Sequence, residues 1–228
     1  MAHHTLLAVV LVRAEPPLCE QVSAARRAGA DLVELRVDCI NDEQAVAELL
    51  AGPHELPFIL TIRARAEGGQ WNASEARRAA LLAKLAALRP EYIDIEYACQ
   101  AELMAPCGVL SDSQRTHQLM LSHHNLHDTP NDLDPVFEQL SASGADVIKA
   151  VFTAHDATCA FRVLEQLRRN VRHRPTIALA MGEAGVLTRV LAAKYGAFLT
   201  FARLEPGVVS ASGQPTIHDL MGLYRWRE

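Results

Sequence analysis

The five cysteines of this 228-residue chain are odd in number and show no CxxC spacing. This pattern excludes a disulfide scaffold and a zinc ribbon, and it favours a reducing compartment. No apolar stretch reaches about 18 residues, and no charged segment followed by a long apolar run opens the chain. We therefore expect no membrane span and no signal peptide, and we expect the protein to be cytoplasmic.

An excess of basic charge is also missing. The chain has 22 Lys and Arg residues against 27 Asp and Glu residues, which gives a formal net charge of -5 at pH 7. This balance gives no reason to expect nucleic acid or an anionic membrane surface as a partner. A GxGxxG sequence is absent after the first expected strand, which disfavours a dinucleotide-binding doubly wound sheet.

Short runs of β-branched and apolar residues alternate with helical patterns along the chain. We expect strands at residues 6–12, 32–37, 58–62, 92–95, 119–122, 145–152, 176–180 and 199–201. Helices are expected at residues 21–28, 41–50, 74–88, 133–142, 156–170, 184–194 and 217–224, with a helix and an irregular turn within residues 99–114. Such alternation implies parallel strands joined by right-handed crossovers.

Eight strand–helix units close into a (β/α)8 barrel, for which about 200–250 residues is typical. We therefore expect one α/β barrel domain over residues 1–228. An open doubly wound sheet is the alternative architecture.

Several expected strands carry charges on one face. In the second strand, apolar side chains occupy the odd positions from 33 to 37 and charged ones the even positions from 34 to 38. The fourth strand repeats this pattern, with Asp94 and Glu96 opposite Ile93 and Ile95, and Arg63 ends the third strand. Because successive side chains alternate faces, apolar faces that meet the helices send the charged faces into the barrel.

The inward charges balance in sign: Glu34, Asp94 and Glu96 stand against Arg36, Arg63 and Lys149. Unpaired charges in a low-dielectric interior are very costly, so a compensated cluster suits a site for a polar, anionic substrate. Taken singly, each residue could instead line a solvated rim. Barrel active sites lie at the carboxyl ends of the strands, where several of these residues are expected.

Lys149 lies in the middle of the buried strand expected over residues 145–152. A buried ammonium is costly, so such a lysine can lose its proton and become a nucleophile toward a carbonyl carbon. It can also pair with an acid or extend to solvent from the strand end. The charged cluster around it favours the nucleophile.

Three histidines, His123, His124 and His127, follow the fifth expected strand. Histidine is the side chain best matched to proton transfer near neutral pH. A loop histidine without function and a metal site are the alternatives. The metal site is disfavoured because the spacing is not that of HExxH and no carboxylate is interleaved. We expect no metal, and one histidine facing Lys149 across the mouth of the barrel.

From about residue 30 to the C-terminus, an ordered series of motifs resembles type I 3-dehydroquinate dehydratase. The motifs are DLVELRVD (31–38), LTIR (60–63) with EGG (67–69), YIDIE (92–96), SHHN (122–125), GADVIK (144–149), MGE (181–183), TR (188–189), LTFA (199–202) and SASGQ (210–214). Each motif is short, but the ordered series is highly specific.

The resemblance implies a (β/α)8 barrel, often a homodimer, that dehydrates 3-dehydroquinate to 3-dehydroshikimate without a metal or an added cofactor. It implies that Lys149 is the Schiff-base lysine, that His124 is the general acid and base, and that Glu67 orients or tunes this histidine. The substrate hydroxyls would be bound by Glu34, Arg36 and Arg63. The substrate carboxylate would be bound by Arg189, Ser210 and Gln214. An apolar wall would be formed by Met181 and Phe201.

Two positions depart from the family pattern. Ser212 stands where the family usually has a proline. Because the fixed φ of proline is lost, the open state of this loop should be more populated. Asn125 stands where aspartate is common, which removes a negative charge beside His124. Another Schiff-base barrel such as a class I aldolase, a ligand-sensing barrel without catalysis and a metal-dependent hydrolase are the competing functions.

Overall fold

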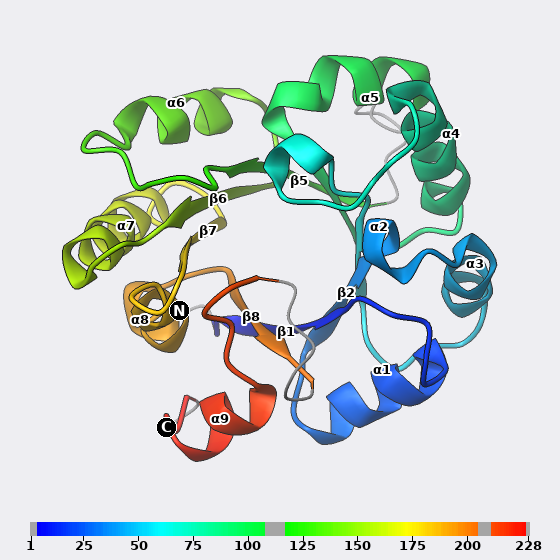
Figure 1. Cartoon of the computed structure of the whole chain (residues 1–228), viewed down its shortest axis with the longest axis horizontal. Coiled ribbons are helices and arrows are strands. Elements are labelled where there is room, and N and C mark those ends of the chain that lie inside the picture. Colours follow the sequence, from blue (N-terminus) through cyan, green and yellow to red (C-terminus); the bar gives the residue numbers. More distant parts are fainter. Residues whose placement is uncertain (1–3, 108–116, 205–210, 227–228) are drawn as a thin grey trace.

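Eight parallel strands curl into a barrel in the computed structural model, which describes residues 4–107, 117–204 and 211–226 (Figure 1). The strands are β1 Leu6–Leu11, β2 Leu32–Arg36, β3 Phe58–Thr61, β4 Tyr92–Glu96, β5 Gln118–His124, β6 Val147–Thr153, β7 Thr176–Met181 and β8 Leu199–Arg203. Their order is β7-β6-β5-β4-β3-β2-β1-β8. Between the outer two, the Phe198 N–H donates to the Thr176 carbonyl at 2.8 Å. The expected (β/α)8 barrel is confirmed.

Helices cover the outer face of the strands. They are α1 Leu18–Arg27, α2 Val37–Ile40, α3 Glu43–Ala51, α4 Glu75–Ala86, α5 Gln100–Cys107, α6 Asp134–Ala142, α7 Ala157–Asn170, α8 Val186–Val190 and α9 Ile217–Gly222. Side chains of Asp42, Ser74 and Asp156 cap α3, α4 and α7 by accepting a backbone N–H. Within the described ranges, no helix has the length and apolar character needed to span a membrane.

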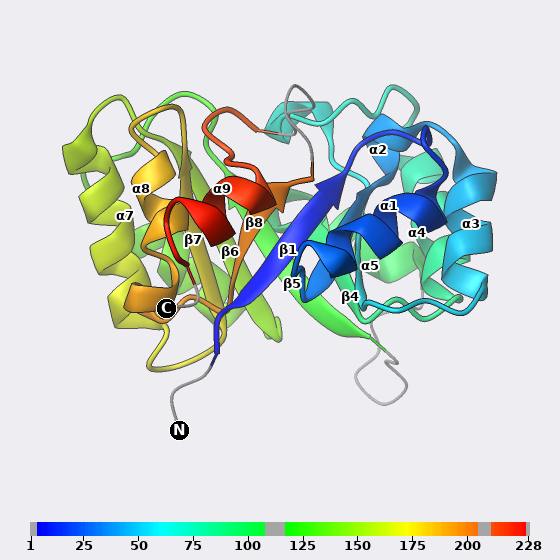
Figure 2. The same ribbon diagram turned by 90° about the horizontal axis from the view of Figure 1, so that it is seen from below.

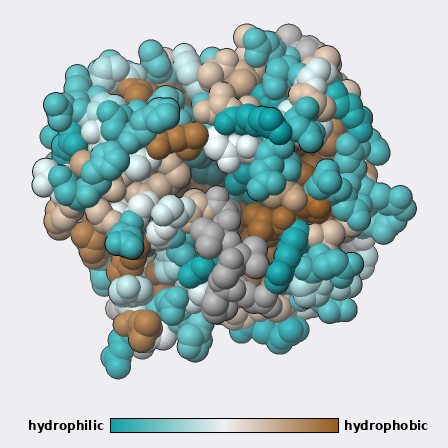
Figure 3. All heavy atoms as spheres, in the orientation of Figure 1, coloured by the Kyte–Doolittle hydropathy of each residue, from teal (hydrophilic) through white to brown (hydrophobic). Residues whose placement is uncertain are grey.

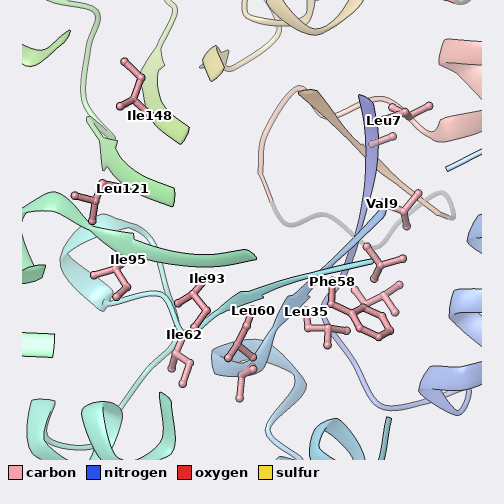
Figure 4. Packing of buried hydrophobic residues seen from close by; sticks show 14 of the residues in the cluster. Leu7, Val9, Leu35, Phe58, Leu60, Ile62, Ile93, Ile95, Leu121 and Ile148 are labelled. Atoms are coloured by element: carbon pink, nitrogen blue, oxygen red, sulfur yellow. The ribbon is translucent and has the colours of Figure 1, made fainter. Parts of the chain in front are cut away.

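Strand side chains divide into an outer and an inner apolar layer. Residues such as Leu35, Leu60 and Ile93 point outward and pack against the helices (Figure 4). Inside the barrel, residues such as Leu32 and Met120 form a separate apolar cluster. The charged residues expected inside are all buried: Glu34, Arg36, Arg63, Asp94, Glu96 and Lys149. The predicted alternation is therefore confirmed, and these side chains are not a solvated rim.

Several expected boundaries are wrong, among them the end of β2 and the end of β5. Val37 and Asp38 do not extend β2 but belong to α2, which turns the Asp38 carboxylate back onto Arg36. The fifth strand runs on through His124, which is paired in register with Val151.

The expected helix over residues 184–194 is also wrong, because it divides into α8 and a 3-10 turn at Ala193–Tyr195. Helix α8 begins at Val186, after Gly185. At Gly185 the chain packs so closely that a Cβ atom would lie 2.4 Å from the Ala180 carbonyl oxygen.

Arg78 links the helical layer to the strand ends. It lies on α4, yet it is fully buried, and its Nη1 donates to the Ile62 carbonyl at 2.9 Å and to Glu96 at 2.7 Å. Glu96 in turn accepts the Ala64 N–H at 2.8 Å and lies 3.1 Å from Nη1 of Arg63. A helix residue thus fixes the end of β3, at the rim toward which the β1 arrow points in Figure 2.

We expect Arg78→Met to lower the free energy of unfolding by about 3 kcal/mol, because it leaves part of a buried carboxylate without its cation. Arg77→Met is the matched control, since Arg77 pairs with Glu43 at the surface and its loss should cost about 0–1 kcal/mol. Urea unfolding measures both variants, and equal losses would contradict this role of Arg78.

Candidate active site

A cavity with about 610 Å³ not occupied by protein atoms opens at the carboxyl ends of the strands. In the view of Figure 1, this face of the molecule is hollowed near its centre (Figure 3). The structure brings ten of the eleven expected site residues to the cavity wall: Glu34, Arg36, Arg63, Glu67, His124, Lys149, Met181, Arg189, Phe201 and Gln214. The eleventh, Ser210, lies outside the described residues.

The amine of Lys149 lies at the floor of this cavity and is paired with acids. Its Nζ is 2.8 Å from Oδ2 of Asp94 and 3.6 Å from Oε1 of Glu34. It also lies 4.5 Å from the centroid of the Phe201 ring, at a distance where an aromatic face attracts a cation. A buried lysine can act as a neutral nucleophile, pair with an acid or extend to solvent, and the structure shows Lys149 paired with acids. The cation is therefore compensated without leaving the interior.

Asp94 holds two cations at once. Its Oδ2 lies 2.8 Å from Lys149 and 2.8 Å from Nη2 of Arg63, and its Oδ1 accepts the Ser122 hydroxyl at 2.6 Å. Burial raises the pKa of Asp94, but the charges of Arg63 and Lys149 outweigh it and hold that pKa well below its usual range. Sequence reasoning placed Asp94 in the charged cluster but missed it as a site residue, although strand alternation carries the signal.

His124 and Glu67 form a second pair at the cavity. Oε2 of Glu67 accepts the His124 backbone N–H at 3.0 Å and lies 2.8 Å from Nδ1 of the ring. Burial, with the nearby charges of Arg63 and Lys149, lowers the pKa of His124 well below its usual value, so the imidazole is neutral near pH 7. Burial raises the pKa of Glu67 to about 7, although Arg63 opposes that rise.

When Glu67 is ionised, it sets the tautomer of the His124 ring. An ionised carboxylate only accepts hydrogen bonds, so Nδ1 of His124 must then carry the ring hydrogen. That leaves the lone pair of Nε2 free to take a proton, as a general base requires.

The three neighbouring histidines do not converge. His124 lines the cavity, whereas the His123 ring lies 6.1 Å from the Phe152 ring and the His127 carbonyl contacts His155. In the described part of the chain, no cluster of three His, Cys, Asp or Glu residues could hold a metal.

The Asn125 side chain turns away from His124 and shapes the loop after β5. Its Nδ2 donates to Asp128 at 2.8 Å, and its Oδ1 accepts the backbone N–H groups of His127 and Asp128. At the other departure from the family pattern, the Ser212 carbonyl accepts the Gly182 N–H at 3.2 Å. Beside it, a Cβ atom on Gly213 would lie 2.1 Å from the Gly182 oxygen, so this approach requires glycine. The effects of Asn125 and Ser212 on catalysis stay predictions.

Arg189 is a buried cation whose Nε has no hydrogen-bond partner among the described residues. Burial lowers the pKa of Arg189 to about 10, while Glu34 opposes the shift, so the guanidinium is charged near pH 7. By contrast, Arg36 is held by Asp38 through two hydrogen bonds. A charged guanidinium at a cavity, paired with no carboxylate in the described ranges, is suited to bind an anionic group of a ligand.

A family model for type I 3-dehydroquinase matches residues 8–228. The chain belongs to this family. The bifunctional 3-dehydroquinate dehydratase/shikimate dehydrogenase of Arabidopsis thaliana is 35% identical over 211 residues, which are 91% of this chain but only 34% of the plant protein. The 3-dehydroquinate dehydratase of Dehalococcoides mccartyi is 32% identical over 92% of this chain and 95% of its own.

Solved members of the family share the fold. The crystal structure of 3-dehydroquinate dehydratase from Geobacillus kaustophilus has a TM-score of 0.81 at 23% identity and covers 97% of this chain and 90% of that chain. The type I enzyme from Clostridium difficile has a TM-score of 0.84 at 21% identity and covers 97% of this chain and 91% of that chain. The barrel is thus that of the type I 3-dehydroquinase family.

Because the pKa of Glu67 is raised in the folded chain, the free energy of unfolding should depend on pH. Folding favours the protonated carboxyl between its ordinary pKa of 4.5 and the folded value of about 7. Its stabilisation is fully present below about pH 4.5 and is lost as the pH rises to about 7. We therefore expect the natural chain to lose about 1 kcal/mol of stability per pH unit relative to Glu67→Gln in this window.

Urea unfolding of both proteins at several pH values measures this difference. Glu138→Gln, an exposed substitution on α6, is the control for replacing a carboxylate by an amide. A constant difference between the natural chain and Glu67→Gln across the window would show that Glu67 has an ordinary pKa.

Proposed function

We propose that Lys149 forms an imine with the ketone of 3-dehydroquinate and that His124 moves the protons of the dehydration. As a member of the type I 3-dehydroquinase family, the chain is a 3-dehydroquinate dehydratase, and its product is 3-dehydroshikimate. One observation carries the residue assignment: a buried lysine, a neutral imidazole and an arginine that pairs with no carboxylate of the described residues line the same cavity.

The acids around Lys149 favour the imine as much as they favour the resting ammonium. The ammonium must release a proton before its nitrogen attacks the ketone carbon, and water then leaves as the imine forms. A protonated imine carries the same single positive charge as the ammonium it replaces. Asp94, at 2.8 Å, and Glu34, at 3.6 Å, therefore face a cation before and after the bond forms, and no uncompensated charge arises in the interior.

Elimination then follows in two proton transfers. The iminium withdraws electrons from the adjacent carbon, so the neutral His124 ring can remove a proton there and leave an enamine. The enamine expels the β-hydroxyl, which takes the same proton from His124 and departs as water. A second water hydrolyses the iminium and restores Lys149. General acid–base catalysis supplies about 10²–10⁴-fold, so the imine and the positioning of the substrate supply the remainder.

Substrate binding uses the rest of the cavity wall. Arg189 binds the carboxylate, because its guanidinium is buried and no carboxylate of the residues that the structure describes pairs with it, and Gln214 and Ser210 assist it. Glu34, Arg36 and Arg63 bind ring hydroxyls, and Met181 and Phe201 form the apolar wall that covers the ring.

The setting of the enzyme is part of the proposal. We infer a homodimer in the cytoplasm, working without metal or cofactor. A reducing compartment is supported by the free thiols of Cys19, Cys39, Cys99 and Cys159. Light scattering on the purified chain measures its oligomeric state, and a monomer would contradict the dimer.

Borohydride added with 3-dehydroquinate should reduce the imine and increase the protein mass by one reduced adduct. Lys149→Met should lose both this adduct and the rise in absorbance that the conjugated enone product gives. The chain has only two other lysines, Lys84 and Lys194, so the double variant with arginine at both positions is the control. An active Lys149→Met variant would exclude the imine, and products of carbon–carbon cleavage would favour an aldolase.

His124→Ala separates imine formation from proton transfer. It should accumulate the adduct on mixing with substrate yet turn over at least about 10²-fold more slowly, because the enamine cannot form without a base. His123→Ala, the neighbouring ring beside Phe152, is the matched control and should turn over normally. A normal rate in His124→Ala would move the base to another residue, with His123 examined next.

Arg189→Met tests the carboxylate site. It should raise KM by about 10–100-fold with a smaller change in kcat, because a charge-assisted hydrogen bond contributes about 1.5–3 kcal/mol. Steady-state kinetics on 3-dehydroquinate measures both constants. An unchanged KM would place the substrate carboxylate elsewhere.

A further inference from the structure

We propose that Asp38 is a positioning residue that holds Arg36 and the Glu67 loop in place for proton transfer. Here the Glu67 loop means residues 63–70, which run from the end of β3 to the start of the segment before α4. The proposal rests on the proposed function. Asp38 does not line the cavity, so it can affect the reaction only through residues that do.

The Asp38 carboxylate is fully buried and collects donors from two separate parts of the chain. Oδ1 accepts Nε of Arg36 at 2.9 Å and the Arg63 backbone N–H at 3.1 Å. Oδ2 accepts Nη2 of Arg36 at 2.7 Å and the Gln70 backbone N–H at 3.0 Å. Burial raises the pKa of Asp38, but Arg36 and the two backbone N–H groups outweigh burial and lower it. The carboxylate is therefore ionised and accepts these four bonds, together with a longer one from Sγ of Cys39 at 3.4 Å.

Two of these bonds fix both ends of the Glu67 loop. Within the loop, the Gly69 N–H donates to the Ala64 carbonyl at 2.9 Å, and a Cβ atom on Gly69 would lie 1.9 Å from the Arg63 oxygen. The loop is thus closed tightly on itself, and Glu67 points from it to His124 at 2.8 Å. Releasing either end moves the carboxylate that sets the tautomer of the His124 ring.

The other two bonds hold the Arg36 guanidinium, which does line the cavity. A bidentate pair fixes both the position and the plane of a guanidinium. One carboxylate therefore couples an arginine of the cavity wall to the loop that orients the base, although Asp38 itself does not line the cavity.

Asp38→Asn is the direct test because it keeps the shape of the side chain. An amide presents one oxygen and one NH2 group, so in either orientation it loses one bond to Arg36 and one bond to an end of the loop. We expect kcat to fall about 10²-fold, as a misplacement of about 1 Å can cause. KM should rise by about tenfold through Arg36, and borohydride should still trap the imine, since Lys149 makes no bond to Asp38.

Amide hydrogen exchange supplies a readout that does not depend on turnover. Residues 63–70 should exchange at least about tenfold faster in Asp38→Asn than in the natural chain, because the Arg63 or the Gln70 N–H loses its acceptor. Asp42→Asn is the matched control: the Asp42 side chain caps α3 by accepting the Ala45 N–H and not an N–H of the loop, so its substitution should change neither kcat nor this exchange. Unchanged kcat and unchanged exchange in Asp38→Asn would overturn the proposal.

Gly69→Ala provides a second route if Asp38→Asn folds poorly. It forces the loop open near Arg63 while leaving Asp38 and Arg36 intact, so it should lower kcat with little change in KM and retain the trapped imine. Normal kcat in Gly69→Ala would also overturn the proposal. Failure of the natural chain to form any adduct would instead refute the imine on Lys149, while exchange at residues 63–70 would still report on Asp38.

Discussion

The carboxylate of Asp94, held between the cations of Lys149 and Arg63, is the interaction on which the site depends. Each cation lies 2.8 Å from the same oxygen, and the Ser122 hydroxyl donates to the other oxygen. Removing one partner of a buried ion pair costs about 3–5 kcal/mol, because the remaining charge stays in a low-dielectric interior. Asp94 therefore fixes the lysine nitrogen and the Arg63 guanidinium together, before any substrate is present.

This charged layer is stable because the elements around it supply its counter-charges and remove water. Below it, apolar residues such as Leu32 and Met120 fill the barrel. From outside, Arg78 reaches Glu96, and Asp38 receives Arg36 and two backbone N–H groups. Such preorganised dipoles and charges act strongly in a site that water cannot screen. Arg189 differs from its neighbours because no carboxylate in the described part of the chain pairs with it, which is why we assign the substrate anion to it.

The alternation of apolar and charged residues predicted the barrel, its inward charges and the burial of Lys149. It could not predict which acid pairs with Lys149, because that depends on the stagger between β4 and β6. Arg78 gave no signal, since an arginine on an amphipathic helix is usually solvated. Glu67 and Arg189 were assigned through family resemblance: Glu67 lies in a single turn after β3, and Arg189 lies on α8, whose five residues are too few to show a helical period. The turn into α2 was missed because the hydrogen bonds of Asp38 form only in the folded chain.

We propose that the nitrogen of Lys149 is positive both before and after it bonds to the substrate. Proton uptake measures this most directly. His124→Ala is mixed with 3-dehydroquinate at pH 8, above the pKa of about 7 for Glu67, and a pH indicator follows formation of the imine. An ammonium that becomes an iminium takes up no net proton, which is the result we predict. Uptake of about one proton per site would mean a neutral lysine in the resting enzyme, and would contradict the pairing of an ammonium with Asp94.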